Sequence, residues 1–232
     1  MSFPSGSVNT LPSGHAITTL DVNYDFRVDL AAAGAGGLRL YQQAADSSFN
    51  NTSERALPAS ARNGSYMGVW SADLDMDGDL DLVAARENGP PLSLRNNGDG
   101  TFDERSFFDE VETLRAFIWA DLNADGPPDA AMLDASGQLH VYENQRSGTP
   151  RFRRRSLPDT IASARALAAS DIDGDATIDL LLLQPDGTIL RLTPSQQEMG
   201  SWSTEVLLKW EALPDVDVAS TRLLTGDFDN NG

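Results

Sequence analysis

The 232-residue chain is predicted to be an all-β protein, a β-propeller of four-stranded blades with about four and a half blades present. Three observations lead to this prediction. An acidic motif recurs about every 50 residues, short apolar or alternating stretches surround each copy, and turns rich in Gly, Asn, Asp or Pro separate these stretches. A period near 50 residues is typical of propeller blades, whereas helical solenoids repeat every 33–47 or so.

The acidic motif opens each repeat, and five copies align. They read "DVNYDFRVDL" from Asp21, "DLDMDGDLDL" from Asp73, "DLNADGPPDA" from Asp121, "DIDGDATIDL" from Asp171 and, at the end of the chain, "DFDNNG" from Asp227. The approximate repeat ranges are 15–65, 66–114, 115–163, 164–220 and an incomplete 221–232, after an N-terminal extension at 1–14.

The same four strands are expected in the same order within each repeat. Those before the acidic loop are "HAITTL" (15–20), "YMGVW" (66–70), "LRAFIW" (114–119), "ARALAA" (164–169) and "STRLL" (220–224). Those after it are "DLAAAG" (29–34), "DLVAA" (81–85), "DAAML" (129–133) and "DLLLL" (179–183). A turn and an alternating third strand follow, at 38–43, 92–97, 139–144 and 189–194, and then a fourth segment such as "TFDERSFF" (101–108). No segment shows helical periodicity over more than two turns.

Charge and composition exclude several classes of function. The net charge of −18 disfavours nucleic acid and anionic membrane surfaces as partners. The chain has no cysteine, so it has neither disulfides nor thiolate sites. The longest apolar run, Leu180–Leu183, is far too short to cross a bilayer, so no direct membrane insertion is expected. Residues 1–14 lack a basic segment followed by an apolar run, so no signal peptide is expected there.

The acidic loops are predicted to bind Ca²⁺. Oxygen side chains fall at loop positions 1, 3, 5 and 9, and the backbone carbonyl of position 7 adds a ligand. Such a loop suits a hard cation that binds 6–8 oxygens. Because the loops contain no His or Cys, Ca²⁺ is favoured over a transition metal. The predicted ligands are Asp21, Asn23, Asp25 and Asp29; Asp73, Asp75, Asp77, Asp79 and Asp81; Asp121, Asn123, Asp125, Pro127 and Asp129; and Asp171, Asp173, Asp175 and Asp179.

The four complete loops are not equivalent. The alternative, that they are solvated acidic turns, is weakest for the second loop, which has all its acids and Gly78 at position 6 for the sharp turn. Phe26 stands at that position in the first loop, and Gly174 at position 4 is expected to shift the turn of the fourth. An EF-hand would have a bidentate Glu at position 12, where these loops run into an apolar strand, so the acid at position 9 is expected to close the site.

These residues resemble the FG-GAP/VCBS repeat, the calcium-binding propeller blade also found in the head of integrin α subunits. The match is closest over 66–108, where "DLDMDGDLDL" is followed by "LSLRNNGDGTF", and it is similar to the subset associated with ASPIC/UnbV domains and cartilage-acidic-protein-like propellers. The other repeats lack this glycine-rich turn. The resemblance implies a seven-bladed propeller, Ca²⁺ in the loops and a role in adhesion or ligand binding, and it implies no reaction.

The expected function is therefore a calcium-binding, non-catalytic module that binds a protein or glycan ligand. Its expected location is extracellular, periplasmic or at the cell surface, because loops of this kind need Ca²⁺ of about 10⁻⁴–10⁻³ M. The chain is interpreted as a piece of a longer propeller, which could self-associate through open blade edges. The alternative is a propeller-type polysaccharide lyase or hydrolase domain.

Two other features are assigned structural roles. His15 and His140 lie far apart in the sequence without metal-ligand spacing, so each is interpreted as a surface or strand residue rather than a catalytic base. The basic run "RFRRR" (151–155) is interpreted as a solvated strand edge that prevents strand addition.

Overall fold

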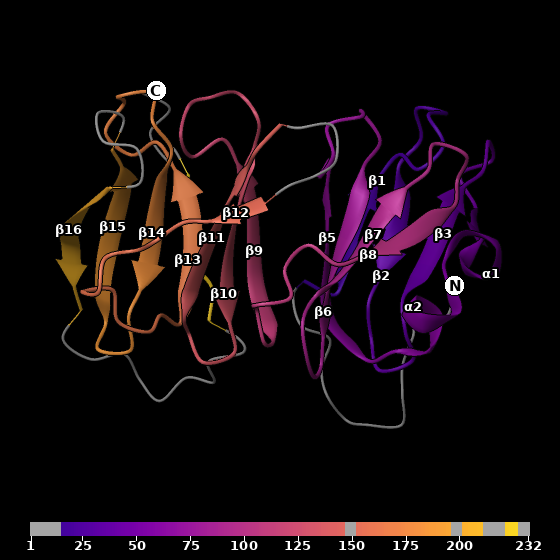
Figure 1. Cartoon of the computed structure of the whole chain (residues 1–232). Coiled ribbons are helices and arrows are strands. Elements are labelled where there is room, and N and C mark those ends of the chain that lie inside the picture. The colour runs from indigo at the N-terminus through magenta and orange to yellow at the C-terminus, as the bar shows by residue number, and fades with distance from the viewer. Residues whose placement is uncertain (1–14, 147–151, 196–200, 211–220, 227–232) are drawn as a thin grey trace. The chain divides into compact units, whose positions relative to one another are not determined.

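Each repeat folds into one four-stranded antiparallel sheet (Figure 1). The computed structural model describes residues 15–146, 152–195, 201–210 and 221–226. In every sheet the strands follow one another in chain order, and each pairs antiparallel with its neighbour. The prediction of an all-β protein made of propeller blades is confirmed. Of the incomplete fifth repeat, 221–226 forms no strand, and Asp227 lies outside the described residues, as does the extension 1–14.

The sheets of the first two repeats span residues 17–105. The first contains β1 (Ile17–Leu20), β2 (Asp29–Ala32), β3 (Arg39–Gln43) and β4 (Phe49–Asn51). The second contains β5 (Tyr66–Ala72), β6 (Asp81–Arg86), β7 (Leu92–Asn96) and β8 (Phe102–Arg105). Two short helices, α1 (Ser53–Ala56) and α2 (Ala59–Asn63), lie between them. No helix in the described part of the chain has the length and apolar character needed to cross a membrane.

The sheets of the third and fourth repeats span residues 114–209. The third contains β9 (Leu114–Ala120), β10 (Asp129–Asp134), β11 (Leu139–Asn144) and β12 (Phe152–Arg154). The fourth contains β13 (Ala166–Ser170), β14 (Asp179–Leu183), β15 (Thr188–Pro194) and β16 (Trp202–Lys209). All residues of β10 and β14 are buried, as their continuous apolar sequences predict.

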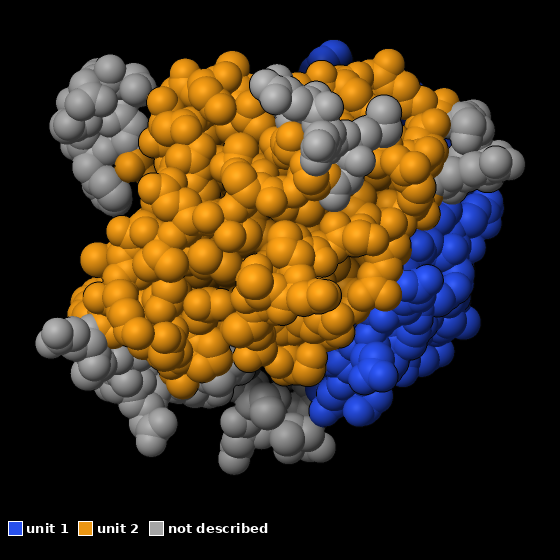
Figure 2. Space-filling model, turned by 60° about the vertical axis from the view of Figure 1, so that its left-hand side comes forward, with its two compact units in different colours: residues 1–115, 147–150 blue, residues 116–146, 151–232 orange. Residues whose placement is uncertain are grey.

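The chain forms two compact units (Figure 2). Unit 1 comprises residues 1–115 and 147–150, and unit 2 comprises 116–146 and 151–232. Within unit 1 the first two sheets share a core, in which Leu40 and Leu82 are almost fully buried. Within unit 2 the third and fourth sheets do the same around Val141 and Leu180. Paired sheets thus bury one face of each blade.

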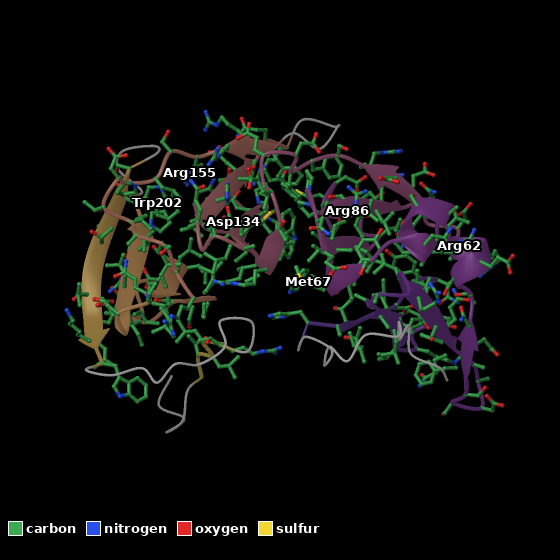
Figure 3. All side chains as sticks on the ribbon, turned by 90° about the horizontal axis from the view of Figure 1, so that it is seen from below. Arg62, Met67, Arg86, Asp134, Arg155 and Trp202 are labelled. Atoms are coloured by element: carbon green, nitrogen blue, oxygen red, sulfur yellow. The ribbon has the colours of Figure 1, made fainter. Side chains whose placement is uncertain are left out.

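The basic run 151–155 is only partly a solvated edge. Arg153 and Arg154 on β12 are exposed, as predicted, whereas Arg155 is buried. Its guanidinium lies 5.0 Å from the ring centroid of Trp202, and both residues are labelled in Figure 3. The prediction for Arg155 was wrong because a cation can be buried when an aromatic face is available to it.

His140 is a buried strand residue. It lies on β11, and its Nε2 is 2.9 Å from Oδ2 of Asp134, the last residue of β10. Asp134 Oδ1 accepts hydrogen bonds from Ser136 and from the backbone N–H of Gln138. The pair therefore closes the β10–β11 turn, in agreement with the structural role assigned to this histidine.

Candidate metal centre

Every acidic loop connects the first strand of a blade to the second. The loops cover residues 21–29, 73–81, 121–129 and 171–179 and are called here the first to fourth loops, with positions numbered from the first aspartate. Position 9 begins the second strand, so regular pairing fixes this residue in the sheet. Position 12 lies inside the same strand, as predicted.

All four loops share one backbone conformation. Positions 4 and 6 both have positive φ angles: 56° and 62° at Tyr24 and Phe26, 60° and 95° at Met76 and Gly78, 56° and 101° at Ala124 and Gly126, and 75° and 67° at Gly174 and Ala176. Gly174 therefore does not shift the turn of the fourth loop, contrary to expectation, because position 4 is left-handed in every repeat. Glycine adopts this conformation freely, whereas Phe26 and Ala176 adopt it at a steric cost.

The aspartate at position 1 closes the turn. One of its oxygens accepts a hydrogen bond from the backbone N–H of position 6, at 2.8 Å for Phe26, 3.0 Å for Gly78, 2.9 Å for Gly126 and 2.9 Å for Ala176. This bond uses only one oxygen of each carboxylate. In the first, third and fourth loops the other oxygen accepts the backbone N–H of position 5. In the second loop the other oxygen, Asp73 Oδ1, has no hydrogen-bond partner.

The aspartate at position 9 is fully buried in every loop. Its Oδ2 accepts the N–H of position 2 in three loops, from Val22, Leu74 and Ile172. Its Oδ1 accepts the N–H of a third-strand residue in three loops, from Gln43, Asn96 and Asn144. The residue at this register in the fourth loop is Pro194, which has no N–H; the hydroxyl of Thr193 and the guanidinium of Arg191 bond Asp179 Oδ1 instead.

The second loop brings three carboxylates together around unsatisfied oxygens. Asp73, Asp75 and Asp81 each offer an oxygen within 4.8 Å of the others. Oδ1 of Asp73 and Oδ1 of Asp75 are buried and have no hydrogen-bond partner. Buried polar atoms nearly always have a partner, and a buried carboxylate oxygen without one is costly. A divalent cation would satisfy both atoms, so these residues fit the ion.

Two predicted ligands of the second loop do not belong to this cluster. Asp77 Oδ1 accepts the N–H of Asp79, and its Oδ2 bonds Arg95. The side chain of Asp79 lies against Gly98, where a Cβ would be 2.6 Å from Oδ2, so only the Asp79 carbonyl could serve as a ligand, as predicted. The φ of 74° at Gly98, together with this close approach, favours glycine in the turn of the second repeat.

The fourth loop resembles the second, and the other two loops differ. Asp171, Asp173 and Asp179 form the second cluster with oxygens within 4.8 Å, and Asp175 lies outside it. In the described residues, no such three-carboxylate cluster forms in the first or third loop, where position 3 is Asn23 or Asn123. In the third loop, Asp129 Oδ2 is buried without a hydrogen-bond partner, while Asp121 and Asp125 occupy positions 1 and 5. Pro127 has no side-chain ligand, so its carbonyl alone could bind an ion.

The first loop carries its own cation. Arg27 Nη1 lies 2.7 Å from Oδ2 of Asp25, and Asn23 donates to the same oxygen. Asp21 closes the turn and Asp29 is buried, as in the other loops. Both oxygens of Asp21 and both oxygens of Asp25 accept hydrogen bonds, so this loop offers fewer free oxygens than the second.

Burial raises the pKa of the position 9 carboxyls in the first three loops. Desolvation raises the pKa of Asp81 to about 7, although hydrogen bonds from Asn96 and Leu74 oppose the shift, and the pKa of Asp129 to about 6. It also raises the pKa of Asp29. In the absence of a cation these carboxylates are therefore held in an environment that disfavours their charge.

The sequence analysis missed residues that come from the third strand of each blade. Arg95 and Asn96 contact the second loop, and Arg191 and Thr193 contact the fourth. Asn96 also donates to the carbonyl of Leu80. Their signal in the sequence is weak, because they lie 12–15 residues beyond the last residue of the loop and only strand register brings them to it.

The blades and their acidic first turns define a β-propeller repeat protein with candidate cation sites in its loops. A model of the FG-GAP-like repeat matches residues 21–84, 73–132 and 121–182, and the chain belongs to this family. No curated protein matches the chain. Among solved structures, it is similar to a lectin from Agrocybe aegerita whose study describes recognition of non-reducing terminal N-acetylglucosamine, with a TM-score of 0.58 and 16% identity. The match covers 82% of this chain and 51% of the lectin, so the chain spans about half the lectin's length.

Proposed function

We propose that this chain is a calcium-binding β-propeller module that binds an extracellular glycan and catalyses no reaction. The observation that carries the calcium proposal is the pair of buried oxygens without hydrogen-bond partners, Asp73 Oδ1 and Asp75 Oδ1, beside Asp81. Membership of the FG-GAP-like family supports it.

The chemistry of the donors favours Ca²⁺. The clusters offer carboxylate oxygens, and the loops contain no His or Cys. In the second loop Asp73, Asp75, Asp81 and the Asp79 carbonyl would hold the ion; in the fourth, Asp171, Asp173 and Asp179 would do so. The ion would supply positive charge that links the start of a loop to its end. An extracellular location follows in the proposal, because about 10⁻³ M Ca²⁺ is available there.

A second set of residues supports a ligand surface on unit 1. Tyr24, Phe26 and Met76 are exposed on the first and second loops, and the Tyr24 hydroxyl donates to the carbonyl of Gly78, so the two loops are neighbours. Phe26 is 96% exposed and has a φ of 62°, a strained conformation for a bulky residue. Exposed aromatic rings offer flat apolar faces, and such strain is concentrated at functional sites.

The chemistry of this surface favours a neutral or cationic glycan. Tyr24 hydrogen-bonds a loop with five carboxylates, and the net charge of −18 disfavours sulfated or other anionic polysaccharides. The similarity to a lectin supports a glycan over a protein ligand.

Melting with Ca²⁺ or EDTA tests the calcium proposal. At a Ca²⁺ concentration ten times Kd, each site contributes about 1.4 kcal/mol, so two sites should raise Tm by roughly 5–10 °C. Asp73→Ala/Asp75→Ala should remove one bound ion, measured by calorimetric titration. Asp46→Ala, at an exposed aspartate that bonds Ser48 in another turn, is the matched control and should leave the stoichiometry unchanged. Equal Tm values in Ca²⁺ and EDTA would contradict the proposal.

A glycan array tests the ligand proposal. Phe26→Gly removes the exposed ring, so it should abolish binding to neutral glycans. Because glycine adopts this backbone conformation without strain, Tm should stay equal or rise. Val206→Ser, at an exposed apolar residue of β16, is the control and should retain binding. Failure of the unaltered protein to bind any neutral or cationic glycan would reject this part and leave the calcium proposal to its own test.

A further inference from the structure

Arg95 connects the third strand of the second blade to the acidic loop. Its Nε lies 2.5 Å from Oδ2 of Asp75 and its Nη2 lies 2.6 Å from Oδ2 of Asp77. One guanidinium therefore holds loop positions 3 and 5 together. Because the N–H groups of a guanidinium point in fixed directions, these two bonds orient both carboxylates as well as balancing their charge.

The oxygens that Arg95 holds are not the oxygens that lack partners. Asp75 gives Oδ2 to Arg95, while its Oδ1 is buried and unsatisfied. Asp73 likewise gives Oδ2 to the N–H of Gly78 and keeps Oδ1 unsatisfied. The arginine thus orients the carboxylate of Asp75 without using the oxygen that could bind an ion.

In the fourth loop an arginine also holds the position 3 aspartate, from a different strand position, and its second partner is position 9 rather than position 5. Arg191 bonds Asp173, again at loop position 3, and its Nε lies 2.9 Å from Oδ1 of Asp179. In the second blade Leu94 pairs with Leu82 of β6, and Arg95 comes one residue after Leu94. In the fourth blade the equivalent pair is Leu192 with Leu180 of β14, and Arg191 comes one residue before Leu192. The two arginines are therefore two register positions apart, and each repeat reaches the same contact separately.

The two blades with asparagine at loop position 3 have no arginine at this register, although Arg27 pairs with Asp25 in the first loop and the Arg146 guanidinium lies against Gly126 of the third. At the register of Arg95, the first and third blades carry Gln42 and Glu143, next to Tyr41 and Tyr142. Their loops have three carboxylates at the ligand positions, whereas the second and fourth have four. One arginine reduces the charge of the four carboxylates in the second and fourth loops to −3.

From these contacts we infer that Arg95 and Arg191 are positioning residues for the calcium sites of the second and fourth loops. Each holds one oxygen of the position 3 aspartate, so that the other faces the ion, and balances the fourth carboxylate before the ion binds. This inference rests on the proposed calcium binding. Partners that orient a ligand typically change metal affinity by about 10–100-fold when removed.

The test follows backbone amides by NMR during a Ca²⁺ titration. The amide of Gly78 reports the second loop and that of Gly174 reports the fourth, so each site is measured separately. In Arg95→Gln the Gly78 amide should respond only at about tenfold or more higher Ca²⁺, while the response of the Gly174 amide is unchanged. Arg95→Lys keeps the charge without the fork and should be intermediate. Arg105→Gln, which removes an exposed pair with Asp103, is the matched control and should leave both responses unchanged.

A double variant separates positioning from competition. Asp75→Asn removes the carboxylate that Arg95 orients, so the double variant Asp75→Asn/Arg95→Gln should bind Ca²⁺ about as tightly as Asp75→Asn alone. Tighter Ca²⁺ binding in Arg95→Gln would show that the arginine competes with the ion and would overturn the inference, as would an unchanged Gly78 response. If the unaltered protein shows no Gly78 response at all, the proposed calcium binding itself fails.

Discussion

At the scale of single residues, the acidic loops combine one buried carboxylate with several that are paired at the surface. Asp81 and Asp129 are almost completely buried at the start of their strands, and burial raises their pKa values to about 7 and about 6. In the unfolded chain both would titrate near 3.8. The folded protein without cation therefore binds more protons than the unfolded chain between about pH 4 and pH 7.

This difference predicts the pH dependence of the cation-free protein. Stability falls as pH rises wherever the native state holds more protons, so Tm in EDTA should decrease between pH 5 and pH 8. Bound Ca²⁺ favours the charged carboxylate of Asp81 in the second loop, so at saturating Ca²⁺ the decrease should become smaller. Melting curves across this range, with and without the ion, give the measurement. Identical profiles in both conditions would contradict the assignment of Asp81 to a cation site.

At the scale of elements, two glycine-containing turns differ in how closely another part of the backbone approaches them. Gly37 lies in the β2–β3 turn with a φ of 99°, and a Cβ there would be 1.9 Å from the carbonyl oxygen of Arg62. Gly89, in the β6–β7 turn, has a φ of 92° and nothing within 4 Å of the same position. The turn at Gly37 packs against the end of α2, and the turn at Gly89 is open.

Alanine at these glycines should therefore cost different amounts. Gly89→Ala should destabilise by about 1 kcal/mol through backbone strain alone, whereas Gly37→Ala should cost about 3 kcal/mol or more, because α2 must move. Urea unfolding in Ca²⁺ measures both. Equal losses would show that the contact between the β2–β3 turn and α2 contributes nothing.

The elements also show what the sequence could and could not predict. The strands around each loop were predictable because apolar runs such as 179–183 and acidic motifs repeat at one period. The helices α1 and α2 have four and five residues, too few for a periodic signal, and were not predicted. Arg95 and Arg191 were missed for another reason: their contacts depend on strand register, which no local pattern specifies.

At the scale of the whole molecule, the last strand of the fourth blade, β16, carries several exposed apolar side chains. Val206 and Leu208 on β16 are 60% and 51% exposed, and Trp210 follows them. β16 is the terminal strand of its sheet. Long apolar edge strands favour pairing with another chain.

The chain is therefore expected to self-associate through β16 at high concentration. Val206→Lys/Leu208→Lys should shift the sedimentation profile toward the monomer, because charged residues on an edge strand oppose pairing. Tm should change little, since neither side chain is buried. Ile17→Lys, at an exposed position of β1, serves as the control. Association that is the same in both variants would exclude β16 as the contact.

Pro194 has a consequence for how such repeats can diverge. In three blades a backbone N–H of the third strand donates a hydrogen bond to Oδ1 of the buried aspartate. A substitution of the donor residue removes this bond only if the new residue is proline. In the fourth blade that duty has passed to the Thr193 hydroxyl and to Arg191, so point mutation can reach it. The sequence of such a blade can diverge from the common motif while its buried aspartate still accepts two hydrogen bonds. A search for the motif alone would then overlook the diverged repeat.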